Sequence, residues 1–412
     1  MPLIRPFPGI RPAPEYVDGV IAPPYDVLNT DEAKERAAGK PNSFLHISKP
    51  EIDLPPGTDP HDDSVYLRGR KNFDAMLGAG VIKRDASPCF YFYRIVMGEH
   101  TQVGLVAAAS CTDYASGRIR KHEHTQPAKE DDRVRQIDVL GAQTGPVFLT
   151  YPQNDAVDRI ASEVVTADPD ADVVADDGIR HTLWVVSGKP RIDALSKHFE
   201  AMPRLYIADG HHRSAAALRV MEQRRDANPG HTGDEAYNYF LSVIFPDNQV
   251  QILDYNRVVK DLNGLSPSEL LDAIGKAFDV EKLDSAGKPR QAGEFSMYLD
   301  GDWYRLRVHP DKVPRDPVGR LDVSVLQDQL IGSVLGIADQ RRDKRIDFVG
   351  GIRGLAELAR RVDSGEMAVA FSFFPTSLAD LMAVADANEI MPTKSTWFEP
   401  KLADGLVSHG LD

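Results

Sequence analysis

The chain has 412 residues, of which 42% are hydrophobic and 27% charged, and its formal net charge is −14. This length supports one large domain or two to three ordinary domains with substantial cores. The excess of acidic side chains argues against nucleic acid as the main partner, although a local basic site stays open. No apolar run is long enough to cross a membrane and residues 1–8 lack a signal-peptide pattern, so we expect a cytoplasmic protein.

The first half of the chain predicts helices mixed with hairpins. Thr30 to Ala38 is typical of a helix, with Thr30 as N-cap and Gly39 as the stop, and residues 64–80 also predict a helix. Phe90 to Met97 and Val103 to Tyr114 predict a hairpin. Further on, strands are expected at 147–151 and 182–187, with a helix over 155–166 between them.

The second half continues the same mixture. Tyr239 to Phe245 and Val250 to Val258 predict a hairpin, as do 295–299 and 303–308. A helix opens at Ser266 and runs to about 278. The last third alternates helix near 323–335, strand at 348, helix 354–362, strand 367–373 and helix 377–388. We therefore expect an α+β protein with mixed sheets, divided into a core over 1–260 and an α/β portion over 261–412 that contributes a C-terminal active-site loop.

The most informative segment runs from Leu205 to Leu218. A short apolar run that includes Tyr206 and Ile207 predicts a buried strand, Asp209-Gly210 breaks it, and strong helix formers follow from His211. A glycine there lets backbone approach a ligand, and the free N–H groups and dipole of a helix N-terminus attract anions. Arg213 adds a bidentate fork that suits phosphate. The pattern predicts a phosphate-binding turn.

A second cluster covers residues 118–133. If 118–125 is a strand, Arg118, Arg120, His122 and His124 share one face, and Lys121 and Glu123 the other. If the next segment is helical, Lys129 and Arg133 lie one turn apart. A solvated, charged edge strand would explain the same residues. A zinc site built from these histidines with His211 and His212 is a further alternative, which the neighbouring arginines oppose.

Two further segments could contribute to a site. In residues 391–401, Lys394, Ser395 and Thr396 resemble the end of a phosphate loop in residue type, and Lys401 follows, but the glycines of that loop are missing. The alternative is a loop that packs Trp397 and Phe398 into the core. Asp26, held after two prolines, could act as a general base or hold Mg²⁺, or could simply cap a turn.

These motifs together resemble a bacterial family described as a domain of unknown function, number 1015. The resemblance rests on four segments spread over nearly the whole chain: residues 22–27, 122–125, 207–213 and 394–401. The turn Asp209-Gly210-His211-His212-Arg213, followed by a helix of small residues, also resembles the phosphate-binding motif of the ParB/sulfiredoxin superfamily. Its form is most similar to that of free-serine kinases, which would make residues 1–260 a ParB/sulfiredoxin-like core.

The resemblance implies a phosphotransferase that uses ATP or ADP with Mg²⁺ to phosphorylate a small hydroxyl substrate, with L-serine as the first choice. The expected catalytic residues are Asp26, His211 and His212. The residues expected to bind the nucleotide are Asp209, Gly210, Arg213, Arg118, Arg120, His122, His124, Lys129, Arg133, Lys394, Ser395, Thr396 and Lys401. No residue is assigned as a metal ligand.

Two other functions stay open. A phosphomonoester hydrolase, acting for example on phosphoserine, would use the same basic pocket with His211 or His212 as the acid. A nucleotide-binding ParB-like regulatory or DNA-associated module would need a recognition helix and a basic surface, and this acidic chain shows neither. Phosphate release without nucleotide would favour the hydrolase, and salt-dependent binding to DNA would favour the module.

Overall fold

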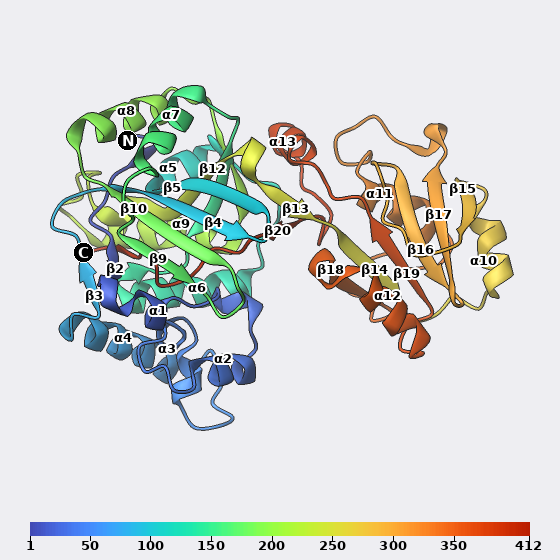
Figure 1. Ribbon diagram of the computed structural model, residues 1–412, viewed down its shortest axis with the longest axis horizontal. Coiled ribbons are helices and arrows are strands. Elements are labelled where there is room, and N and C mark those ends of the chain that lie inside the picture. The colour runs from blue at the N-terminus through green and yellow to red at the C-terminus, as the bar shows by residue number, and fades with distance from the viewer. The chain divides into compact units, whose positions relative to one another are not determined.

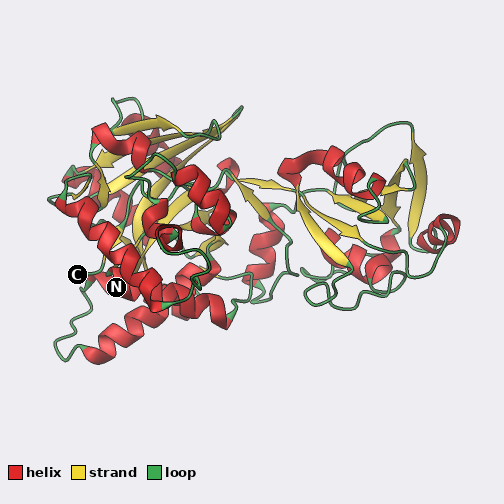
Figure 2. Ribbon diagram, turned by 90° about the horizontal axis from the view of Figure 1, so that it is seen from below, coloured by secondary structure: helices red, strands yellow, loops and turns green.

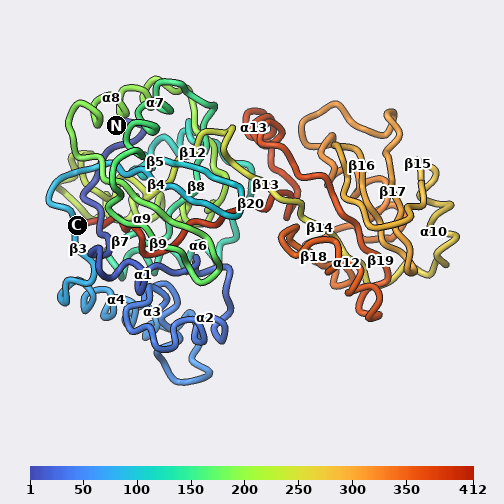
Figure 3. The backbone as a smooth tube through the Cα atoms, in the orientation of Figure 1, coloured from blue at the N-terminus to red at the C-terminus, as the bar shows by residue number.

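A computed structural model describes residues 1–412 and divides them into two compact units, Met1–Val250 together with Pro400–Asp412, and Gln251–Glu399 (Figure 1). Each unit combines helices with strands, which confirms the α+β class (Figure 2). The sequence division lay near residue 260 and kept the C-terminus in the second part. In the structure, residues 400–412 return among the N-terminal segments of the first unit (Figure 3). None of the helices has both the length and the apolar character needed to cross a bilayer.

The first unit is built on a nine-stranded mixed sheet. Its strands are β1 (Ile4–Arg5), β4 (Phe90–Met97), β5 (His100–Ser110), β6 (Ile119–Arg120), β8 (Val147–Tyr151), β9 (Ala171–Val174), β10 (Arg180–Val186), β11 (Leu205–Asp209) and β12 (Tyr239–Pro246). Their order is β6-β11-β8-β12-β5-β4-β10-β9, and β1 pairs with β5. β6 runs parallel to β11 and β8 parallel to β12, whereas the other pairs are antiparallel.

Two short strand pairs complete this unit. β2 (Ile10–Pro12) pairs with β3 (Ile82–Arg84), and β7 (Ala142–Gln143) pairs with β21 (His409–Gly410). The second pair holds the returning C-terminal segment in place.

The first unit also contains nine helices. They are α1 (Val17–Val20), α2 (Thr30–Ala37), α3 (Leu45–Ser48), α4 (Asp63–Gly78), α5 (Cys111–Ser116), α6 (Pro127–Leu140), α7 (Asp155–Val164), α8 (Lys189–Glu200) and α9 (His211–Ala227). α9 packs against α6 and α5, and α6 also packs against α4. Ala216 and Val220 of α9 are buried in one cluster with Leu149 and Ile207 of the sheet. Small side chains on α9 let this helix approach the strands closely, which fixes the position of the turn before it.

The second unit has its own six-stranded sheet. Its strands are β14 (Tyr255–Val259), β15 (Phe278–Leu283), β16 (Glu294–Leu299), β17 (Asp302–Val308), β18 (Ile346–Gly350) and β19 (Val369–Phe373), in the order β15-β17-β16-β19-β14-β18. All these pairings are antiparallel. The helices are α10 (Pro267–Ile274), α11 (Asp322–Leu326), α12 (Gly354–Asp363) and α13 (Leu378–Asp386), and β13 (Gln251–Leu253) pairs with β20 (Trp397–Glu399).

Three local expectations need correction. Tyr239–Pro246 does not form a hairpin with the next apolar run, because β12 pairs with β5 and β8 while β14 pairs with β18 and β19. The cap of α2 is Asn29, whose side chain accepts from the Glu32 N–H at 2.9 Å in a capping box, and not Thr30. The strand expected over 118–125 has only two residues, so the shared face of four basic side chains does not form.

Candidate functional site

The turn between β11 and α9 is held open by a glycine. Gly210 has φ 99°, a left-handed conformation that glycine adopts without steric cost. A Cβ at this position would stand 3.0 Å from Nε of Arg213, so a side chain would press on that guanidinium. No side chain caps α9, and its first-turn N–H groups therefore meet no side-chain acceptor from the cap residue. The strand, turn and helix match the sequence prediction, and the result is a helix start suited to an anion.

A charged cluster lies at this turn. Arg213 is buried, and one of its terminal nitrogens stands 3.8 Å from Asp209 Oδ1. Lys401 places Nζ 3.3 Å from Oδ2 of the same carboxylate. Burial would raise the pKa of Asp209, but Lys401 and Arg213 hold it well below its ordinary value. The carboxylate is therefore ionised, and it fixes two cations beside the helix start.

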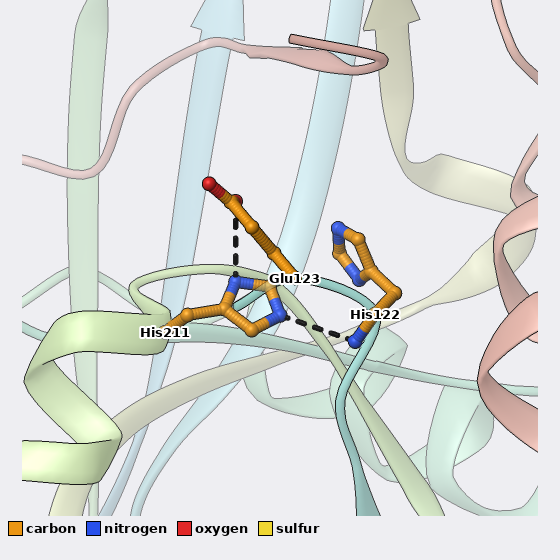
Figure 4. Close-up of side chains that lie close together, drawn as sticks. All are labelled: His122, Glu123 and His211. Atoms are coloured by element: carbon orange, nitrogen blue, oxygen red, sulfur yellow. Dashed lines mark hydrogen bonds and ion pairs between the residues drawn. The ribbon is translucent and has the colours of Figure 1, made fainter. Parts of the chain in front are cut away.

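His211, the first residue of α9, forms a small group with His122 and Glu123 from the loop after β6 (Figure 4). The backbone N–H of His122 donates to Nε2 of His211 at 3.4 Å, and the two rings meet edge to face with centroids 4.4 Å apart. Nδ1 of His211 stands 3.7 Å from Oε2 of Glu123. Because Nε2 accepts a hydrogen bond, the neutral ring carries its proton on Nδ1, facing the Glu123 carboxylate.

The same three residues could hold a metal ion, since one ligand atom from each lies within 4.8 Å of the others. Burial lowers the pKa of His122 to about 4 and that of His211 well below its ordinary value, so both rings are neutral, as metal ligation requires. An ion between His211 Nδ1 and Glu123, however, would have to replace the proton that the bond from His122 assigns to Nδ1. The geometry favours a histidine that orients a carboxylate.

His212 and its neighbours form the outer part of the site. Nε2 of His212 accepts from the backbone N–H of Gln126 at 3.0 Å and so anchors the start of α6. Burial and then Lys129 lower the pKa of His212, whereas Asp26 raises it. Asp26 is exposed on the turn Tyr25–Val27, and its charge also acts on Arg213. The charges of Asp26 and Lys129 therefore both act on His212.

A cavity adjoins Arg213 within the first unit. Arg133, Tyr25 and Asp404 are among its lining residues, and Arg133 lies over the Tyr25 ring at 3.9 Å. Asp404 is buried, and burial raises the pKa of its carboxyl to about 7, with Arg213 opposing the shift. The cavity therefore places the carboxyl of Asp404 close to Arg213, on the inner side of the turn between β11 and α9.

The structure gives the other expected residues the following surroundings. Arg118 bonds to the side chain and carbonyl of Glu200 and to the carbonyl of Met202, and Arg120 pairs in register with Tyr206 on the neighbouring strand. His124 is exposed on the loop after β6. Lys394, Ser395 and Thr396 belong to the second unit, where the carbonyl of Lys394 accepts from Arg257 at 2.9 Å and the carbonyl of Ser395 from Thr376.

The sequence analysis did not single out two carboxylates that the structure adds. Glu123 had been placed on the face opposite the histidines, but a loop in place of a strand turns it toward His211. Asp404 stands in a segment without helical or strand periodicity, and no local signal marked it. Its position near Arg213 depends on the return of residues 400–412 to the first unit.

Three solved structures illustrate what the chain is similar to. A free serine kinase in complex with AMP is 13% identical, with 71% of this chain and 86% of that chain covered, at a TM-score of 0.35. A conserved hypothetical protein from Pyrococcus furiosus is 13% identical (73% and 93% covered, TM-score 0.35). SbnI with a C-terminal truncation, from Staphylococcus aureus, is 10% identical (73% and 85% covered, TM-score 0.36). Such weak likenesses assign no role to any residue here.

A search of curated proteins gave no match. The family model described as "Protein of unknown function (DUF1015)" matches residues 4–324, which is most of the chain. The four segments that carried the resemblance in the sequence include the loop with Glu123 and the turn with Arg213, both inside this range. The chain belongs to the DUF1015 family.

Proposed function

We propose that the first unit transfers a phosphoryl group from a nucleotide to the hydroxyl of a small substrate. The observation that carries this proposal is the start of α9: a buried arginine, Arg213, stands beside an uncapped helix N-terminus, and a histidine on the same turn orients a carboxylate. Phosphoryl transfer depends mainly on positioning the reactants and on neutralising phosphate charge. The substrate hydroxyl is the nucleophile, so the protein has to supply these groups and not a nucleophile of its own.

The phosphates would bind at the helix start. The first N–H groups of α9, the Arg213 fork and Lys401 together supply donors for phosphate oxygens, and Asp209 holds both side chains in place. Lys129, near His212, adds a further cation at the rim. Mg²⁺, when bound with the nucleotide, would neutralise phosphate charge, and Asp26 is an exposed carboxylate near enough to this turn to take part.

Glu123 is our choice of general base. It would take the proton from the substrate hydroxyl as that oxygen bonds to the terminal phosphorus and the bond from phosphorus to the leaving nucleotide oxygen breaks. His211 Nδ1, at 3.7 Å, would keep the carboxylate oriented. Asp26, the base expected from the sequence, is the alternative, and L-serine remains the first substrate to test.

A thermal-shift panel tests nucleotide binding. We expect ATP or ADP with Mg²⁺ to raise the Tm of the full chain, because a ligand that binds only the folded state stabilises it in proportion to its concentration over Kd. If ATP, ADP and CTP all leave Tm unchanged, the proposal is wrong. Release of phosphate from phosphoserine without any nucleotide would favour the hydrolase instead.

The base is identified by two variants. Glu123→Gln should lower kcat about 100- to 1,000-fold while nucleotide binding is kept, because a positioned general base contributes on this scale. Asp26→Asn should change kcat less and should weaken the dependence on Mg²⁺. The reverse ranking would assign the base to Asp26.

A further inference from the structure

The cavity beside Arg213 holds two polar atoms that no neighbour satisfies. Oγ of Ser48 and Oδ1 of Asp404 both belong to lining residues of this cavity, both are buried, and neither has a hydrogen-bond partner. Buried polar atoms are nearly always paired, because an unpaired one costs about 1–3 kcal/mol. Two unpaired atoms on one cavity, contributed by α3 and by the returning C-terminal segment, indicate that a polar group fills it.

Cations line the other side of the cavity. Arg133 forms an ion pair with Asp132 and lies over the Tyr25 ring at 3.9 Å, whereas Arg213 donates to the carbonyl of Pro146 at 2.5 Å. Gly145 lies between Arg213 and Asp404. A Cβ at this position would stand 3.3 Å from Cδ of Arg213 and 3.6 Å from Oδ1 of Asp404. The absent side chain leaves an opening between the guanidinium and the carboxyl.

The protonation state of Asp404 determines whether the cavity can bind an anion. The groups that act on its carboxyl are Arg213, Arg133, the charge of Asp26 and the backbone N–H of Tyr25, and the carboxyl in turn acts on Tyr93. Burial raises the pKa of Asp404 to about 7 in spite of the two arginines. A protonated carboxyl is a hydrogen-bond donor, and the hydroxyl of Ser48 is one as well. With both arginines, the walls then present donors to a bound anion.

The charges of the lining residues indicate which anion the cavity would take. Arg133 already shares its charge with Asp132, and Arg213 shares its own with Asp209. A monoanion such as a carboxylate therefore suits the cavity better than a dianion such as phosphate.

We propose that this cavity binds the carboxylate of the acceptor substrate, so that the substrate is a small hydroxy acid, and that Asp404 carries a proton in the complex. The name "acceptor" rests on the proposed function, since the cavity adjoins the Arg213 guanidinium that would hold the phosphates. Arg133 and Arg213 bind the carboxylate oxygens. The substrate hydroxyl then extends toward the turn between β11 and α9.

Calorimetric titration with small probes tests the class of ligand. We expect D-glycerate and L-serine to bind, and glycerol and ethanolamine, which have hydroxyls but no carboxylate, to bind at least tenfold more weakly. Glycerol binding as tightly as glycerate, or ethanolamine binding more tightly than glycerate, would overturn the proposal. Inorganic phosphate that competes with glycerate and binds more tightly would assign the cavity to a phosphate group and also overturn it.

The proton on Asp404 gives a second readout. If the anion binds with uptake of that proton, the Kd for glycerate should rise up to tenfold for each pH unit above about 7. Asp404→Asn keeps the shape and the donor and cannot ionise, so its Kd should stay flat from pH 6 to 8.5. Asp226→Asn, an exposed carboxylate at the end of α9, is the matched control and should keep the wild-type slope. A flat wild-type profile, or a slope kept by Asp404→Asn, contradicts the protonated carboxyl.

Two further measurements separate the possible failures. Gly145→Ala fills the opening and should weaken glycerate binding at least tenfold. Ser48→Ala removes a donor from the cavity wall and should weaken glycerate binding threefold to tenfold while ADP still raises Tm. If Asp404→Asn does not fold, these two variants carry the test. ADP stabilisation without glycerate binding would refute this inference alone, and glycerate binding without any nucleotide effect would refute the proposed function alone.

Discussion

Each unit of the molecule buries one arginine, and the two have different surroundings. Arg257 in the second unit is fully buried, and it donates to the carbonyls of Tyr255, Lys394 and Thr393 with the rings of Phe348 and Phe373 nearby. No carboxylate pairs with it, and burial lowers its pKa to about 9. Arg213 in the first unit is surrounded by carboxylates and lines a cavity. Although burial lowers its pKa, Asp209, Asp26 and Asp404 raise it above the ordinary value.

The difference separates an arginine that holds the fold from one that can hold a ligand. The terminal nitrogens of Arg257 donate to main-chain oxygens and its Nε donates to Oε1 of Gln340, so this side chain fixes the loop at 393–395 and has few donors left for a ligand. Arg213 lies among carboxylates and beside two glycines, Gly210 and Gly145, where a side chain would hinder the approach of a ligand to the guanidinium. Burial alone therefore does not distinguish the two arginines. The neighbouring cavity and the two glycines do.

The largest effects, on nucleotide binding and on stability, are expected from replacing Arg213 and Arg257 one at a time by alanine. Arg213→Ala should weaken nucleotide binding at least 100-fold, about 2.7 kcal/mol, because charge-assisted bonds to phosphate are lost. Arg257→Ala should leave nucleotide binding within twofold but destabilise the second unit by about 3 kcal/mol, since buried carbonyls lose their donor. Arg219→Ala, on the exposed side of α9, is the control for both. Calorimetric titration and hydrogen exchange provide the two readouts.

Equal loss of nucleotide binding in both variants would mean that Arg257 also supports the site. In that case nucleotide binding would depend on the loop carbonyls to which Arg257 donates as well as on the charge of Arg213.

Acid should affect the two units in opposite directions. Burial lowers the pKa of His122, His181 and His409 in the first unit to about 4, so the unfolded chain binds more protons between pH 6.5 and 4 and stability falls as pH falls through this range. Asp404 opposes this, because its raised pKa stabilises the folded state at low pH. In the second unit, burial raises the pKa of Asp322 to about 7, so stability rises as pH falls.

The net effect should be a loss of about 2 kcal/mol or more in the first unit between pH 7 and 5, because one unit of pKa shift corresponds to about 1.4 kcal/mol. Hydrogen exchange measured at both pH values, corrected for the intrinsic exchange rate, reports on each unit through its own peptides. Earlier loss of protection in the second unit would contradict the assignment of buried, neutral histidines.

Two glycines with similar backbone give a smaller and more specific test. Gly210 has φ 99° and Gly301, in the hairpin of the second unit, has φ 84° with open space around its Cα. Alanine at either position should cost about 1–2 kcal/mol, because a Cβ is disfavoured in the left-handed region. Only Gly210→Ala should also displace Arg213 and weaken nucleotide binding, by about tenfold. Thermal unfolding and titration of both variants separate the backbone cost from the effect at the site.

The smallest effects concern two lysines of the C-terminal segment. Lys401→Ala should weaken nucleotide binding about threefold to tenfold, since Nζ stands 3.3 Å from Asp209 beside the helix start. Lys394→Ala should change it less than twofold, because Nζ of Lys394 lies over the Tyr255 ring at 5.4 Å. Equal effects would support the expectation that residues 394–396 bind the nucleotide.

The features that the sequence predicted well are local. The strand, glycine and helix from 205 to 227 follow from an apolar run, a breaker and strong helix formers, and the hairpin of β16 and β17 follows from Asp300-Gly301-Asp302 between two apolar runs. In each case the residues that decide the conformation are neighbours in the chain.

The features that the sequence did not predict depend on distant pairing. The orientation of Glu123 changes with the length of β6, and that strand stops after two residues because only Ile119 and Arg120 find partners on β11. β12 and the strand after it looked like a hairpin because turn residues separate two apolar runs. In the structure β12 pairs with β5 and β8 instead, and this pairing depends on strands that are distant in the sequence. Asp404 reaches Arg213 by tertiary contact alone.

The return of residues 400–412 to the first unit has a consequence for the order of synthesis. On the ribosome, most of the first unit emerges before the second, but Lys401, Asp404 and the partner strand of β7 emerge only after it. At about 5–20 residues per second, the interval is roughly 7 to 30 seconds. During that time the turn between β11 and α9 lacks Lys401 and the cavity lacks the wall that Asp404 supplies, so the first unit is complete only after this last segment has been translated.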